Sequence, residues 1–212
     1  MDLSKAFDHV CHQRLFEILE KKDVPSYIIE LLKYWHGAQQ FRVSWGNSLS
    51  SPFNTGCGIR QGSVLSAKLF ALYMDGLSEI LNKESGCIIG DTRINHIFYA
   101  DDLILFGPSV KCLQNLIDAS VNYIQNNYLS INASKTKIMI VKPKKYIQFG
   151  EPVFKINSDI LEIVNSFKYL GMNITSNLSD DDHITSLYRG QCMRSNIVLR
   201  EFYMCDDKVK VD

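Results

Sequence analysis

Two adjacent carboxylates, Asp101 and Asp102, interrupt a stretch of the chain that is otherwise apolar and aromatic. Residues 94–99 before them alternate in character, and residues 103–106 after them are apolar. That pattern predicts two short strands joined by a tight turn, with the acidic pair at the turn. Carboxylates at the tip of a buried hairpin are costly unless a cation neutralises them, and clustered aspartates usually bind a hard divalent cation. The stretch therefore predicts a metal site whose remaining ligands come from elsewhere in the chain.

The composition is that of a globular protein. The 212 residues are 46% hydrophobic and 22% charged, which suits one large domain or two small ones with a packed core. Lys+Arg and Asp+Glu both number 23, so bulk charge cannot coat nucleic acid, although a locally basic groove remains possible. The six cysteines include no C-x-x-C pair, and we find no signal peptide and no apolar run long enough to cross a bilayer. We therefore expect an intracellular protein without a membrane partner, in the nucleus or the cytoplasm.

The order of predicted elements indicates an α+β fold. Helical periodicity predicts helices at about residues 12–22, 25–35, 64–81 and 110–127. Ser63 is the predicted N-cap of the third helix, and residues 180–212 are predicted to form a polar helical tail. Besides the acidic hairpin, strands are predicted at 41–45, 53–57, 138–141, 153–156, 161–164 and 167–170. Such an order favours an antiparallel sheet with helices packed on one face. The other face would be free to hold a polymer.

Asp2 is the candidate third ligand of the metal site. Because sequential elements usually end up adjacent, the segment that carries Asp2 can lie beside the acidic hairpin. Three carboxylates on neighbouring strands suit two Mg²⁺ ions, with Mn²⁺ as a possible substitute, for chemistry at phosphorus. The alternative is an unremarkable terminus and an ordinary Asp-Asp turn. Taken alone, the pair would favour that alternative, since such turns are common.

Five ordered motifs change this balance. They are DLSKAFD at 2–8, GIRQGSVLS at 58–66, YADD at 99–102, LSIN at 129–132 followed by KTK at 135–137, and FKYLG at 167–171. In this order and spacing they resemble the successive palm motifs of reverse transcriptases, and most of all those of retrotransposons that lack long terminal repeats. The resemblance covers essentially the whole chain. One departure is Ala67, where the family usually has proline.

The resemblance implies a role for each matching residue in the first half of the chain. Asp2, Asp101 and Asp102 match the catalytic metal ligands, and Tyr99 would pack beneath the acidic turn. Phe7 falls where the family places a steric gate against the ribose 2′-hydroxyl, although a core phenylalanine is the simpler reading.

Further matches concern the substrates. Gln61 and Gly62 match the loop that lies against the incoming nucleotide and the template base, and Arg60 could contact phosphate. Lys135 or Lys137 would lie near the triphosphate, and the sequence does not choose between them. Residues 169–171, Tyr169-Leu170-Gly171, resemble the turn that grips the primer end. Lys142, Lys144 and Lys145 could touch the nucleic-acid backbone, or form an ordinary solvated charge run.

The resemblance also implies a domain plan. Residues 1–172 would form the palm, with a primer-grip hairpin at about 152–172, and residues 173–212 the start of a thumb. The family has a fingers region before its first palm strand, so we expect a polyprotein fragment that lacks fingers and accessory domains, with Asp2 on a frayed terminus. One hypothesis is RNA-templated DNA synthesis from an RNA template, a DNA primer and dNTPs. The other is a truncated, inactive palm remnant that at most binds nucleic acid or a protein partner.

Overall fold

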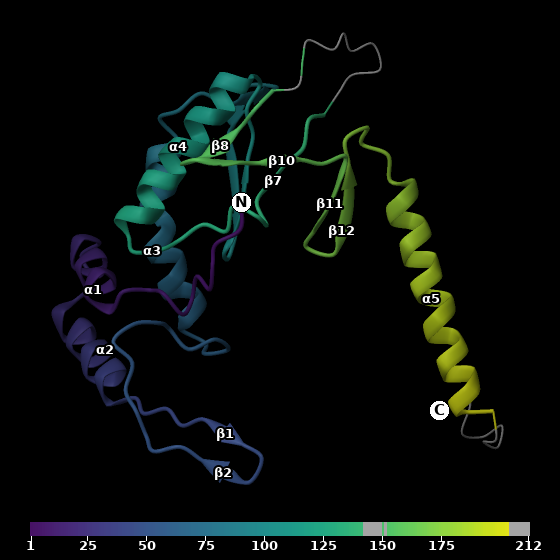
Figure 1. The fold of residues 1–212 in the computed structure, drawn as a ribbon. Helices are drawn as coiled ribbons and strands as arrows, with labels where there is room; N and C mark the ends of the chain where they lie inside the picture. Colours follow the sequence, from purple (N-terminus) through teal and green to yellow (C-terminus); the bar gives the residue numbers. More distant parts are fainter. Residues whose placement is uncertain (142–149, 151, 204–212) are drawn as a thin grey trace. The chain divides into compact units, whose positions relative to one another are not determined.

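The computed structural model describes residues 1–141, 150 and 152–203 (Figure 1). Its helices are α1 (His12–Lys21), α2 (Ser26–Ala38), α3 (Ser66–Leu81), α4 (Val110–Asn126) and α5 (Asp181–Glu201). Its strands are β1 (Ser44–Trp45), β2 (Ser48–Leu49), β3 (Cys87–Ile89), β4 (Thr92–Ile94), β5 (His96–Tyr99), β6 (Asp102–Leu105), β7 (Lys137–Ile138), β8 (Lys155–Ile156), β9 (Asp159–Ile160), β10 (Glu162–Ile163), β11 (Ser166–Tyr169) and β12 (Met172–Thr175). This mixture of helices and mostly antiparallel strands confirms the predicted α+β class.

The chain divides into two compact units. The first contains Met1–Thr136 and Pro152–Leu161, and the second contains the described residues of the ranges Lys137–Glu151 and Glu162–Asp212. Among the described residues, none of the helices combines the length and the apolarity needed to span a bilayer.

The helices of the first unit follow the apolar periodicity of the sequence. In α1, Leu15 and Leu19 lie four residues apart and are both buried. Helix α4 begins at a side-chain cap, because Ser109 Oγ accepts a hydrogen bond from the Cys112 N–H at 3.2 Å. Ser63 was predicted to cap α3 in the same way, and this prediction is wrong. The helix begins at Ser66, and the Ser66 N–H instead donates to the Ser63 carbonyl at 3.2 Å, which makes Ser63 part of a preceding turn.

Several strand predictions are also wrong in detail. The chain turns directly after β1 through a two-residue loop into β2, at 48–49, while the segment predicted to return at 53–57 makes isolated antiparallel bridges from Phe53 to Phe41 and from Cys57 to Cys11. Residues 87–94 form an additional hairpin, β3–β4, that the sequence pattern did not predict. The predicted strand at 138–141 is only β7, and it pairs in parallel with β10 in the second unit. A two-residue strand carries too little alternation to be recognised from sequence.

The acidic hairpin is confirmed as predicted. β5 pairs with β6 in antiparallel register, with Phe98 opposite Leu103 and Tyr99 opposite Asp102. The first residues of the chain extend this sheet beyond β6 through the bridge between Asp2 and Asp102, and Leu3 bridges onward to Ile131. Four extended segments thus lie side by side in the first unit.

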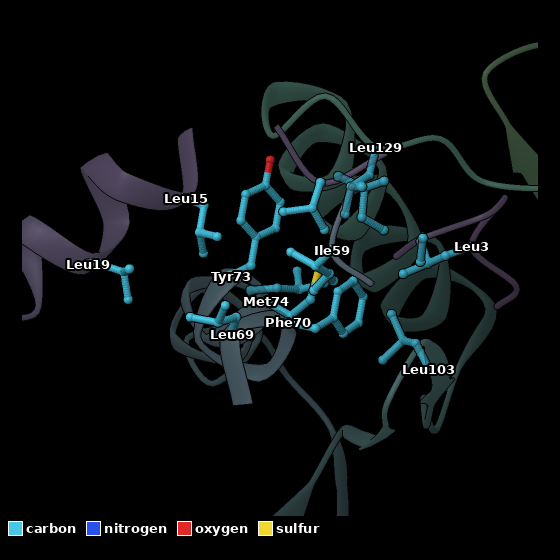
Figure 2. Close-up of a cluster of buried hydrophobic side chains, with 14 of the residues drawn as sticks. Leu3, Leu15, Leu19, Ile59, Leu69, Phe70, Tyr73, Met74, Leu103 and Leu129 are labelled. Carbon is cyan, nitrogen blue, oxygen red and sulfur yellow. The ribbon is translucent and has the colours of Figure 1, made fainter. Parts of the chain in front are cut away.

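The core of the first unit gathers around α3. The helix buries an apolar face that consists of Leu69, Phe70, Tyr73, Met74, Leu77 and Leu81. Figure 2 shows Leu3 and Leu103, from the extended segments, in the same cluster of buried side chains as Phe70. Burying one face of the sheet in this way leaves the opposed pair Tyr99 and Asp102 on the other face, since side chains alternate along a strand.

Candidate functional site

Asp2 and Asp102 oppose each other across two neighbouring strands. The Leu103 N–H donates to the Met1 carbonyl at 3.3 Å, so the ladder bonds flank this pair. Asp2 and Asp102 therefore form the non-hydrogen-bonded type of antiparallel pair, in which the two side chains are closest. Residues that oppose each other in this way project from the same face. The structure thus brings two of the three predicted metal ligands together.

Asp101 lies in the two-residue loop that joins β5 to β6. Its neighbour Ala100 has a φ of 53°, in the left-handed region that the first position of such tight loops requires. The prediction that Tyr99 packs beneath this turn is wrong. Its side chain is 62% exposed, because Tyr99 shares the open face of the hairpin with Asp102 while Phe98 faces the core.

The three carboxylates interact electrostatically at this turn. Burial raises the pKa of Asp102, and the nearby charges of Asp101 and Asp2 raise it further, whereas the amino group of Met1 opposes the shift. Within residues 1–141, 150 and 152–203, however, no three His, Cys, Asp or Glu side chains converge as a metal cluster requires. The side chains are near enough to repel one another without forming a closed ligand cage.

Asp2 is held on both sides, so the expectation of a frayed terminus is wrong. Away from the hairpin, the Asp2 carbonyl accepts from the Asn132 N–H at 2.9 Å. The Asp2 N–H donates to Thr136 Oγ1 at 3.2 Å, and that hydroxyl donates to the Asn132 carbonyl at 2.9 Å. A segment with bonded neighbours along both edges is anchored even where it is short.

Thr136 is the residue of this site that sequence reasoning missed. It lies within the KTK motif, between the two lysines that are candidates to bind the triphosphate, and it is only 1% exposed. A small β-branched residue between two lysines was the available signal, since it indicates an inward-facing position in a charged stretch.

Phe7 packs against the core of the first unit. Its ring stacks on Phe70 of α3, with the centroids 4.6 Å apart and an interplanar angle of 21°, and the residue is only partly buried. The structure therefore includes Phe7 in the packing around α3, while part of the residue remains accessible.

The loop with Arg60, Gln61 and Gly62 is attached next to Phe7. The Ile59 N–H donates to the Phe7 carbonyl at 2.8 Å, and the Ile59 side chain is buried. The three loop residues that follow are exposed. Gly62 has a φ of +80°, where other residues are strained, although nothing lies within 4 Å of the position a Cβ would take.

The two candidate lysines have different surroundings. Lys137 is half-buried and its Nζ forms an ion pair with Glu162 within the second unit. Lys135 is exposed in the first unit, and its N–H donates to Asn132 Oδ1 at 3.1 Å. The ion pair occupies Lys137, so Lys135 is the better candidate for a ligand phosphate. Lys142, Lys144 and Lys145 lie outside the described residues.

Leu170 and Gly171 form the loop of the β11–β12 hairpin in the second unit, between the paired residues Tyr169 and Met172. Both loop residues have positive φ, 46° and 85° respectively. Two successive positive values are the signature of a type I′ turn. The β11–β12 hairpin spans 166–175, so the range 152–172, predicted to hold a primer-grip hairpin, contains the β8–β9 hairpin and the first strand and turn of β11–β12.

Known proteins share these features of sequence. A family model described as reverse transcriptase (RNA-dependent DNA polymerase) matches residues 1–174. The Pol polyprotein of the type-2 retrotransposable element R2DM from Drosophila melanogaster is 29% identical over 182 residues, which cover 83% of this chain and 17% of the relative. The RNA-directed DNA polymerase of the mobile element jockey from Drosophila funebris is 27% identical over 223 residues, which cover 100% of this chain and 24% of the relative.

This chain spans less than a quarter of the length of either relative. The family match covers all five motifs, from the first aspartate to the turn after β11. Together with the elements named in the relatives, it confirms the resemblance to polymerases of retrotransposons without long terminal repeats. The chain belongs to the reverse transcriptase family.

Proposed function

We propose that this chain carries the polymerase palm of a retrotransposon RNA-directed DNA polymerase, which extends a DNA primer on an RNA template with dNTPs. The observation that supports it most is the pairing of Asp2 with Asp102, beside Asp101 in the adjoining turn. Two acids directly opposed on one sheet face destabilise a fold. A fold that nevertheless holds them there is well suited to bind divalent cations.

The three aspartates fit Mg²⁺, with Mn²⁺ as a substitute. They offer only carboxylate oxygens, which hard cations prefer. Burial, together with the repulsion from Asp101 and Asp2, raises the pKa of Asp102, so a cation would relieve a cost already present. When bound, two such ions would lower the pKa of the primer 3′-hydroxyl and stabilise charge on the phosphate oxygens.

The reaction in this proposal is nucleotidyl transfer. The primer 3′ oxygen forms a bond to the α-phosphorus of the dNTP, the bond from that phosphorus to the bridging oxygen breaks, and pyrophosphate leaves. Asp2 and Asp102 would orient the reacting groups on the open face of the sheet. Phe7 would exclude a ribose 2′-hydroxyl, while Gln61 and Gly62 would contact the nucleotide.

The remaining assignments belong to the same proposal. Arg60 and Lys135 would contact phosphate, and the turn of Tyr169, Leu170 and Gly171 would hold the primer end. Residues 1–172 would form the palm and residues 173–212 the start of a thumb. The enzyme would act inside the cell.

A second candidate function is a palm remnant that binds nucleic acid or a protein partner without catalysis. The observation that favours it is that, among the described residues, no three metal-binding side chains converge into a cluster. The two candidates differ in one measurable property, which is metal-dependent primer extension.

We therefore predict that the chain extends a DNA primer on an RNA template in Mg²⁺, and that Asp101→Asn combined with Asp102→Asn lowers the rate about a thousandfold. Loss of preorganised groups that act on the transition state has effects of this order. Incorporation of labelled dNTP is the measurement. Asp23→Asn with Asp182→Asn, two exposed positions, is the charge-matched control.

The outcomes separate the candidates. Extension by the unmutated chain and the control, but not by the acidic-turn variant, supports the polymerase. No extension by the unmutated chain in Mg²⁺ or Mn²⁺ supports the palm remnant. Equal extension by all three proteins would contradict the assignment of Asp101 and Asp102.

A further inference from the structure

The backbone of Gly58 packs directly against the backbone of residues 8–10, which follow Phe7. The Gly58 N–H donates to the Val10 carbonyl at 2.8 Å. The φ of Gly58 is +91°, and a Cβ there would lie 2.9 Å from the carbonyl oxygen of Asp8. Only glycine allows the two backbones to come so close, so the start of the Arg60–Gly62 loop is fixed by backbone contact.

His12 satisfies the other backbone group of Gly58. Its Nε2 lies 2.6 Å from the Gly58 carbonyl oxygen. A carbonyl only accepts, so Nε2 must carry the proton, which holds for one neutral tautomer and for the imidazolium. Both polar groups of Gly58 are thus bonded to residues between Val10 and His12.

The ring of His12, the first residue of α1, packs against α2 and against its own helix. The ring of His36, from α2, lies with its centroid 4.6 Å from that of His12, and His36 is only 6% exposed. Phe16 of α1 flanks the ring at a centroid distance of 6.4 Å. Helix packing therefore sets the direction in which Nε2 points.

We propose that His12 is a positioning residue for the loop of Arg60, Gln61 and Gly62. Through Gly58, it fixes the origin of the loop, so that Gln61 and Gly62 are presented to the nucleotide. Ile59 lies between Gly58 and the loop and is buried, so its fixed packing transmits the position of Gly58 to the loop. The inference rests on the proposed function, because that proposal supplies the nucleotide.

The test compares His12→Phe, which keeps an aromatic ring but loses the donor, with His12→Gln, which keeps a side-chain N–H donor. Amide hydrogen exchange over residues 57–63 is measured on the full chain without nucleotide. Losing a hydrogen bond that closes a local structure corresponds to about tenfold faster exchange at Gly58 and Ile59 in His12→Phe. His12→Gln is expected to restore most of the protection. Exchange within α4 serves as the internal control for global folding.

Steady-state extension adds a second readout. His12→Phe is expected to raise KM for dNTP about fivefold with kcat nearly unchanged, since the loop binds substrate rather than reacting. A chain that was merely destabilised would lose active enzyme, and hence kcat, without a change in KM.

Equal exchange over residues 57–63 in all three proteins would overturn the inference, whatever the enzyme activity. Faster exchange in His12→Phe with kcat lost and KM unchanged would also overturn it. If exchange is faster in His12→Phe but not in His12→Gln, and the unmutated chain does not extend a primer, the positioning of Gly58 by His12 is supported and the proposed function is overturned.

Discussion

Asp102 carries a charge that its surroundings disfavour. Burial raises its pKa above the ordinary value of 3.8, and Asp101 and Asp2 add to the shift. An acid with a raised pKa in the folded state binds more protons there than in the unfolded chain. Stability therefore falls as pH rises from about 3.8 through the raised pKa, and levels off above it.

Asp102→Asn is accordingly expected to stabilise the fold at pH 7, by about 0.5 kcal/mol, because it removes one of two opposed like charges. Urea denaturation at pH 7 and at pH 3 checks this. The difference from the unmutated chain should disappear at pH 3, where the carboxyl is protonated. Asp91→Asn, at an exposed position, is the control and should leave the midpoint unchanged. A lower midpoint for Asp102→Asn at pH 7 would contradict the electrostatic argument.

The turn of the β11–β12 hairpin requires a positive φ at both of its central residues, Leu170 and Gly171. Leu170 and Gly171 both have positive φ, but only glycine adopts it without strain. The strained leucine is 50% exposed, so the turn presents a large apolar side chain to solvent.

We expect Gly171→Ala to weaken this hairpin by about 1 kcal/mol, the approximate cost of a left-handed conformation for a residue with a Cβ. Hydrogen exchange over residues 166–175 would then be about fivefold faster. Gly190→Ala, in the interior of α5, has the opposite expectation, since alanine favours a helix and its Cβ would meet only the Arg194 guanidinium, at 3.4 Å. Unchanged exchange in Gly171→Ala would show that the turn relaxes without cost.

The long elements and the acidic hairpin could be predicted from sequence because their signals are local. Apolar spacing in α1 and the alternation around Asp101 are visible within a few residues. The anchoring of Asp2 could not be predicted in this way, since its partners at 102, 132 and 136 are remote in sequence. The prediction that Ser63 caps α3 was wrong for a similar reason, because hydrogen bonds from Ser66 to the carbonyls of Arg60 and Ser63 set where the helix begins.

Hydrogen bonds from two tyrosine hydroxyl groups connect the helices in the core of the first unit. Tyr73 Oη donates to the Asn127 carbonyl at 2.6 Å, and Tyr123 Oη donates to the Tyr73 carbonyl at 2.9 Å. Arg14 of α1 joins them, because its Nε donates to Asn127 Oδ1 at 2.9 Å. Burial raises the pKa of both tyrosines to about 12, so both remain protonated donors near neutral pH. Three helices thereby share one polar network inside an apolar core.

Tyr73→Phe is expected to destabilise the chain by about 2 kcal/mol, because it leaves a buried carbonyl without its donor while the ring packing is kept. The urea midpoint should fall. Tyr99→Phe is the matched control, since Tyr99 is 62% exposed and its hydroxyl reaches water. Equal midpoints for the two variants would show that solvent replaces the lost bond.

The pairing of Asp2 with Asp102 has a consequence for how copies of such a gene decay. The relative placement of the two acids depends on backbone ladder bonds, which most point substitutions leave intact. A single-codon insertion or deletion within β6 is different, because the residues before and after the change then face opposite sides of the sheet from their original arrangement. If Leu103 keeps its place in the core, Asp102, which precedes it, turns to the core face, and the site is lost with all three aspartate codons still present. In-frame length changes in this strand are therefore a more sensitive record of lost function than the acidic residues themselves.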